Sequence, residues 1–153
     1  MASSEEPITI LMAEDDPDDR VLVGKALNQG RLLNDLRFVG DGEELMDYLH
    51  RRGKYHDPGM APRPGIILLD LNMPKKDGRE ALVEIKADPD LRTIPVVVLT
   101  TSKVEEDIVR SYDVGASSYI TKPVTFEALI QVMKGLGRYW FEIVELPARK
   151  AKQ

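Results

Sequence analysis

Short apolar runs alternate with segments of helical periodicity along most of this chain. Five of the runs are nearly continuously apolar, and several are rich in β-branched residues, which is typical of strands buried on both faces. They are Ile8–Ala13, Leu36–Val39, Ile66–Asp70, Ile94–Thr100 and Ser117–Thr121. Strands of this kind occur almost only in parallel sheets covered by helices, so the pattern predicts such a sheet.

Helical segments follow each of these runs. The first opens at Asp16-Pro17, because aspartate is a favourable N-cap and proline suits the first helical turn. The last begins at about Thr125. The three between them are predicted at Glu43–His50, Gly78–Ala87 and Glu105–Val114. Regular alternation of strands and helices predicts an α/β fold, a doubly wound parallel sheet.

Composition narrows the class of protein. The 153 residues fit one domain, and 42% hydrophobic with 31% charged residues is ordinary for a globular chain. A net charge of -5 argues against nucleic-acid binding, which needs a positive face. The absence of cysteine excludes disulfides and thiolate metal sites. Neither a signal peptide nor an apolar run of about 18 residues is visible, so we expect a cytoplasmic protein without membrane contact.

The predicted organisation has three parts and one long connection. We expect a disordered N-terminus at 1–7, a domain at 8–141 and a C-terminal extension at 142–153. The connection Arg51–Gly65 holds three prolines and three glycines. Loops of that length are uncommon and often functional or mobile, but a tolerated surface insertion explains the segment equally well.

Chemically active residues follow the predicted strands where those strands end. Glu14 and Asp15 follow the first, Asp70 ends the third, Thr100 ends the fourth and Lys122 follows the fifth. In an open α/β sheet, ligands bind beyond the carboxyl ends of the strands, so these side chains should converge.

Such a group of residues suits a metal ion and a phosphoryl group. Carboxylates are ionised at neutral pH and repel one another unless a cation joins them, and oxygen ligands suit Mg²⁺. Asp15 and Asp70 are the expected ligands, with Glu14 or a water completing the shell. Lys122 would supply a positive charge and Thr100 a hydroxyl to the phosphoryl oxygens. Asp70 would then attack phosphorus and form an aspartyl-phosphate.

Each residue taken alone has an ordinary explanation. An aspartate after a strand usually caps a turn or helix, and we assign Asp16, Asp18 and Asp19 to this role because acidic groups favour a helix N-terminus. Lys122 alone would be a surface lysine, and Thr100 alone a strand former. Their joint occurrence at four strand ends favours the functional interpretation.

Four segments, ILMAEDD, IILLDLNMP, VVVLTTS and SYITKP, resemble the receiver domain of two-component response regulators over residues 8 to 138. The resemblance implies a flavodoxin-like (βα)5 sheet with strand order 2-1-3-4-5. It implies that Asp70 is the phosphoacceptor and that Thr100 and Lys122 act with it. The implied Mg²⁺ ligands are Glu14, Asp15, Asp70 and the backbone carbonyl of Asn72. Tyr119 matches the switch aromatic, although a half-buried sheet aromatic is the alternative, and the Lys122-Pro123 bond would be cis.

The same resemblance implies partners. A histidine kinase would donate the phosphoryl group, and the face of the fourth helix, fifth strand and fifth helix would signal it. The long loop, PKKDGRE and GRYWFEIVELP are similar to stand-alone regulators paired with bacterial phytochrome kinases. Output would pass through a protein contact or onward phosphotransfer. We expect a homodimer through the apolar residues Trp140, Phe141, Ile143 and Val144, unless they fold back onto the domain.

Two rival functions are weighed against the receiver. Phosphatases of the haloacid-dehalogenase type also use an aspartate at a strand end, but they need a second aspartate two residues later, where this chain has Asn72. Multiple turnover on a phosphomonoester would favour that rival. A phosphorylation-independent interaction module is the other, and the intact set of Asp15, Asp70, Thr100 and Lys122 argues against it.

Overall fold

A central parallel sheet organises the computed structural model, which describes residues 8–29, 35–101, 104, 106–107 and 115–135. The strands are β1 (Thr9–Ala13), β2 (Asp35–Val39), β3 (Ile66–Asp70), β4 (Val96–Thr100) and β5 (Ser118–Thr121). They pair in parallel in the order β2-β1-β3-β4-β5. The predicted flavodoxin-like fold is therefore confirmed.

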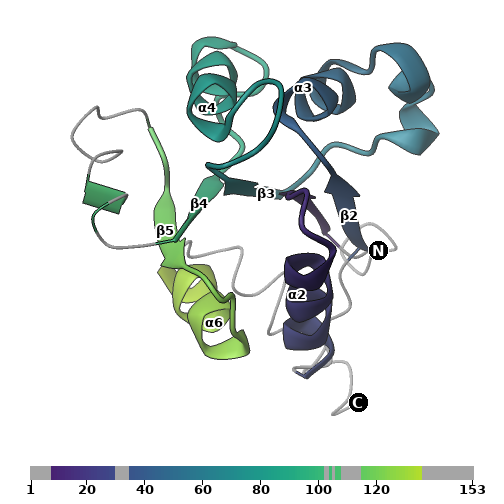
Figure 1. Ribbon diagram of the computed structural model, residues 1–153. Helices are drawn as coiled ribbons and strands as arrows, with labels where there is room; N and C mark the ends of the chain where they lie inside the picture. The colour runs from purple at the N-terminus through teal and green to yellow at the C-terminus, as the bar shows by residue number, and fades with distance from the viewer. Residues whose placement is uncertain (1–7, 30–34, 102–103, 105, 108–114, 136–153) are drawn as a thin grey trace.

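Helices cover both faces of this sheet. They are α2 (Pro17–Gln29), α3 (Gly42–His50), α4 (Gly78–Ala87) and α6 (Phe126–Gly135). Figure 1 shows α3 and α4 on one face of the sheet and α2 and α6 on the other. The predictions for residues 1–7, for most of Glu105–Val114 and for the segment from 136 onward, including Trp140, Phe141, Ile143 and Val144, lie outside the described residues.

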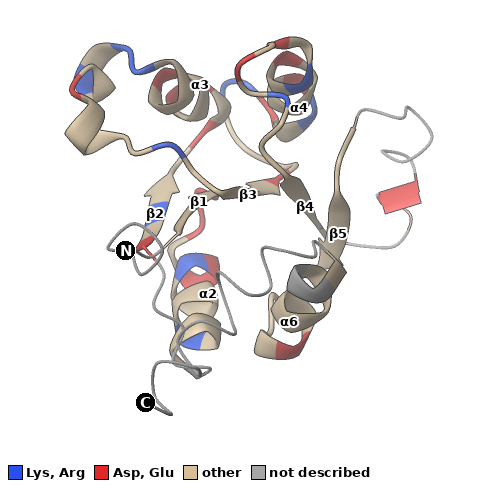
Figure 2. Ribbon diagram, turned by 180° about the vertical axis from the view of Figure 1, so that it is seen from behind, with Lys and Arg blue, Asp and Glu red and all other residues tan. Residues whose placement is uncertain are grey.

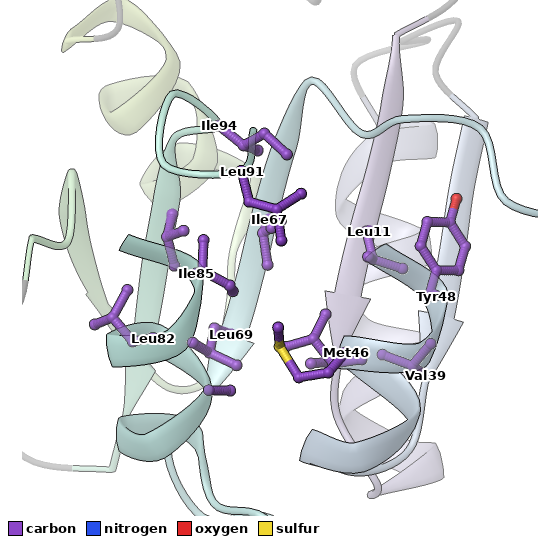
Figure 3. Packing of buried hydrophobic residues seen from close by; sticks show 14 of the residues in the cluster. Leu11, Val39, Met46, Tyr48, Ile67, Leu69, Leu82, Ile85, Leu91 and Ile94 are labelled. Carbon is purple, nitrogen blue, oxygen red and sulfur yellow. The ribbon is translucent and has the colours of Figure 1, made fainter. Parts of the chain in front are cut away.

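The two faces of the sheet bury alternate residues of the same strands, because successive side chains of a strand point in opposite directions. Leu11, Ile67 and Val98 face α3 and α4, whereas their neighbours Met12 and Leu68 face α2 and α6. Figure 3 shows the first of these layers, in which Met46 and Leu82 reach the sheet from the two helices. Two continuous layers therefore hold the central strands in place.

Close backbone contacts position the end of β3. Asp77 caps α4 by accepting from the Glu80 N–H, and Glu80 reaches back to the Asp77 N–H. The first helical residue, Gly78, donates its N–H to the Leu71 carbonyl at 3.1 Å. A Cβ atom at Gly78 would lie 2.4 Å from the carbonyl oxygen of Asp70, so only glycine fits here without a shift. The start of α4 therefore packs directly against the backbone of Asp70.

The long connection Arg51–Gly65 has more structure than its composition predicts. It contains two short 3-10 helices, η1 (Gly53–Tyr55) and η2 (Pro58–Met60). The Tyr55 hydroxyl donates to Glu44 of α3 at 2.5 Å, and the Tyr48 hydroxyl donates to the Pro62 carbonyl at 2.7 Å. These bonds attach the connection to α3. None of the helices in the described ranges combines the length and apolar character that crossing a bilayer requires.

Candidate functional site

The predicted strand-end residues lie where the strand order reverses. Strand β1 lies between β2 and β3, so successive connections run to opposite sides of β1, and open α/β sheets bind ligands beyond the carboxyl ends of the strands at such a point. Glu14 directly follows β1, and Asp70 is the last residue of β3. Figure 2 shows acidic segments in red at the ends of β1 and β3.

The ammonium group of Lys122 lies at the centre of this site. Its Nζ atom is 2.7 Å from Glu14 Oε1, 3.3 Å from Asp70 Oδ2 and 3.2 Å from Asp19 Oδ2. The backbone N–H of Lys122 donates to the Thr100 carbonyl at 2.8 Å, so the lysine is fixed relative to the end of β4. The Lys122-Pro123 peptide bond is cis.

The two innermost carboxylates are held by few partners. Glu14 and Asp70 are 1% and 2% exposed, respectively. Glu14 Oε2 accepts from the Asp16 N–H at 3.1 Å, and Asp70 Oδ1 accepts from the Asn72 N–H at 3.2 Å. Each therefore has a backbone donor on one oxygen and Lys122 on the other.

Burial dominates the electrostatics of these groups. Burial raises the pKa of Glu14 to about 7, although Lys122 and the Asp16 N–H act in the opposite direction. Burial also raises the pKa of Asp70, against the Asn72 N–H and Lys122. For Lys122, burial lowers the pKa, but contacts with Glu14, Asp70 and Asp19 outweigh it and hold the pKa above its usual value. The site thus carries more acidic groups than one ammonium group can neutralise.

A divalent cation fits the remaining donor atoms. Carboxylate oxygens of Glu14, Asp15 and Asp70 lie within 4.8 Å of one another. Asp15 is exposed, so this set opens to solvent on one side. Hard oxygen donors of this kind match the ligand preference of Mg²⁺, which usually keeps several waters. These three residues could therefore hold the ion. Asn72, whose backbone carbonyl is the fourth implied ligand, is exposed and lies two residues after Asp70.

Thr100 and Tyr119 occupy different environments. The Thr100 side chain is fully buried, and its hydroxyl has no hydrogen-bond partner among the parts of the chain that the structure describes. Leaving a buried hydroxyl unpaired costs roughly 1–3 kcal/mol, so an incoming acceptor would be favourable there. Tyr119 is half-buried and packs against the layer beneath α3 and α4, as the sheet-aromatic alternative predicts.

Sequence reasoning did not include Asp19 in the site. It assigned this residue to the N-terminus of a helix, where Asp19 does lie, in the first turn of α2. The side chain nevertheless reaches Lys122, which is 103 residues later in the chain. The sequence offers no periodic signal for this contact, because Asp15 lies before α2 and the i,i+4 spacing applies only within a helix.

Comparisons with known proteins show which sequences and structures this chain is similar to. The family model of the response regulator receiver domain matches residues 10–134. Response regulator Rcp1 from Synechocystis sp. is 44% identical over 145 residues, which cover 95% of this chain and 97% of that protein.

Solved structures are also similar. The bacteriophytochrome response regulator RtBRR has a TM-score of 0.80 at 40% identity, over 86% of this chain and 78% of that one. The phosphorylated cyanobacterial phytochrome response regulator RcpA has a TM-score of 0.71 at 46% identity, over 88% and 94% of the two chains. The Mn²⁺-bound form of Rcp1 has a TM-score of 0.71 at 43% identity, over 89% and 96%.

Proposed function

Because this chain belongs to the response regulator receiver family, we propose that Asp70 accepts a phosphoryl group from the phosphohistidine of a histidine kinase. One observation supports this proposal more strongly than the other observations do. The carboxylate of Asp70 is buried at a strand end with an ammonium group 3.3 Å from one oxygen and a backbone donor on the other. A nucleophile held in this way needs little further ordering before it meets phosphorus.

The proposed transfer is a displacement at phosphorus. An oxygen of Asp70 forms the new P–O bond while the P–N bond of the phosphohistidine breaks, and the released imidazole takes up a proton. Lys122 would then pair with a phosphoryl oxygen, because its ammonium group already lies beside Asp70. The unpaired hydroxyl of Thr100 would donate to a second oxygen. Catalysis of this kind rests mainly on positioning and charge neutralisation.

We assign Mg²⁺ as the cofactor of this reaction. Glu14, Asp15 and Asp70 supply the carboxylate oxygens in the proposal, and the backbone carbonyl of Asn72 completes the protein ligands. The close approach of the three carboxylates supports this assignment, as does the Mn²⁺-bound form of the relative Rcp1. When bound, the ion supplies positive charge to the phosphoryl oxygens.

The partners follow from the same role. We expect the donor to be a phytochrome-type kinase, since RtBRR and RcpA are described as phytochrome regulators. We propose that the chain is a signalling protein that catalyses only its own phosphorylation and dephosphorylation, and that it acts in the cytoplasm. Thr100 and Tyr119 would couple phosphorylation to a signalling face formed by the helix predicted at Glu105–Val114, by β5 and by α6. We further propose that the chain forms a homodimer and that it signals to a downstream protein or to a phosphotransfer partner.

Phosphodonor labelling tests this function. The chain would be incubated with acetyl phosphate and Mg²⁺, and then with purified histidine kinases, and bound phosphate would be counted per chain. We expect about one phosphoryl group per chain, dependent on Mg²⁺ and lost in Asp70→Asn. Asp57→Asn, an exposed change in η2's N-cap, should label like the parent. Label that persists in Asp70→Asn, or repeated turnover of a phosphomonoester, would refute the proposal.

A further inference from the structure

Lys122 has one anionic partner that the proposed metal site does not use. Of the three carboxylates in contact with its ammonium group, Glu14 and Asp70 belong to the set that could hold a cation. Asp19 lies outside that set, yet its Oδ2 atom is 3.2 Å from the same Nζ atom. The two buried carboxylates are thus shared between an ammonium group and a potential metal ion.

A cation and an ammonium group compete for the same oxygens. Glu14 Oε1 and Asp70 Oδ2 each face Lys122, so a divalent ion that binds these residues meets a positive charge a few ångströms away. Two like charges at such separations repel each other strongly, even at the effective dielectric constant of a protein surface. Metal binding is therefore easier if Lys122 can withdraw its charge toward another anion.

Asp19 is placed to be that anion. Its side chain is 24% exposed, whereas those of Glu14 and Asp70 are 1% and 3% exposed, so it is the outermost of the three partners. Asp19 lies in the first turn of α2, and that turn is tied to the end of β1 because the Arg20 side chain donates to the Glu14 carbonyl at 2.7 Å. An ammonium group drawn toward Asp19 therefore stays at the solvent-exposed edge of the site.

We propose that Asp19 is a positioning residue that retains the ammonium group of Lys122 while Glu14, Asp15 and Asp70 bind the divalent cation. This inference rests on the proposed function for the identity of the metal site. It assigns Asp19 no contact with the metal. Loss of Asp19 leaves Lys122 to compete fully for Glu14 and Asp70, so the affinity for the cation falls.

Metal titration tests the inference without any phosphorylation. Binding of Mn²⁺ to the full chain would be followed by electron paramagnetic resonance, and binding of Mg²⁺ by competition. We expect Asp19→Asn to weaken binding about tenfold. Asp18→Asn removes the same charge from the adjacent exposed residue and should weaken binding by less than about threefold, because solvent screens it. Thermal unfolding would verify that both variants are folded.

The decisive measurement repeats the comparison in a Lys122→Met background. If Asp19 acts through the ammonium group, its replacement there should have no more effect than that of Asp18. An undiminished tenfold loss in that background would mean that Asp19 attracts the metal directly, and equal effects of Asp18→Asn and Asp19→Asn in the parent would mean that only net charge matters. Either result overturns the inference. A parent chain that binds no Mn²⁺ overturns it together with the metal assignment, whereas failure of Asp70 labelling alone leaves it standing.

Discussion

Replacing Gly78 with alanine should destabilise the protein, although alanine is the better helix former. Gly78 is the first residue of α4, where the change alone would favour the helix by up to about 1 kcal/mol. The new Cβ atom would lie 2.4 Å from the Asp70 carbonyl oxygen and 2.7 Å from the Leu71 Cα atom. Both obstacles are backbone atoms of a fully buried strand end, so the helix or the strand must move.

The size of the loss follows from overpacking. Inserting a methyl group into a packed interior typically costs about 1–3 kcal/mol, which exceeds the gain in helix propensity. We therefore expect a net loss of about 1–2 kcal/mol, which lowers Tm by roughly 2–4 °C per kcal/mol in a chain of this size. Because the displaced carbonyl belongs to Asp70, phosphorylation from a small donor should slow as well.

Gly24→Ala is the matched control. Gly24 lies inside α2, and a Cβ atom there would meet nothing within 4 Å. The same substitution should stabilise the protein by about 0.5–1 kcal/mol. Urea unfolding followed by circular dichroism would compare both variants with the parent at unchanged m-value. The packing argument is refuted if Gly78→Ala is as stable as Gly24→Ala.

Two further predictions concern the supports of α3 and α4. Burial alone would raise the pKa of Glu44, but hydrogen bonds from Tyr55, Gly40 and Lys54 hold that pKa below its usual value. The ionised Glu44 therefore stabilises the folded protein above about pH 4.3, the pKa of an unfolded glutamate, and this stabilisation is lost as the pH falls through the lower pKa of the folded state. Urea titrations of Glu44→Gln should show a flatter acid limb than those of the exposed Glu43→Gln, and an unchanged limb would contradict this. Asp77→Ala removes the side-chain oxygen that accepts from the Glu80 N–H and should lower the free energy of unfolding by about 1 kcal/mol in the same assay; no loss would mean that the cap contributes little.

The sheet and the meeting of its strand ends were predictable from the sequence for one reason. Strands that are apolar throughout must be covered on both faces, which is typical of parallel sheets, and parallel strands present their carboxyl ends at the same edge. The boundaries were less predictable. Ile94 is buried like a strand residue, so the apolar pattern includes it. The strand β4 nevertheless begins only at Val96, directly after a proline that has no N–H to donate to the neighbouring strand.

The connection between α3 and β3 shows a different limit. Its prolines and glycines predict turns, but its two 3-10 helices depend on bonds from Tyr55 to Glu44 and from Tyr48 to Pro62, which span 11 and 14 residues. Glu44 also accepts from the Gly40 N–H at 2.7 Å, so one carboxylate joins the turn before α3 to the segment after it. No periodic pattern encodes such contacts, because they depend on side chains meeting in space.

The role of Asp19 lies beyond both limits, because a sequence specifies charges but not how they pair. Three carboxylates and one ammonium group were visible at the predicted strand ends, and their imbalance already indicates a cation. Which carboxylate Lys122 keeps when that cation arrives depends on where the first turn of α2 lies relative to the end of β5. Asp18 and Asp19 are identical in charge and adjacent in sequence, and only the rotation of the helix directs one toward Lys122. The difference between their two variants therefore measures a property of the fold that composition and spacing cannot contain.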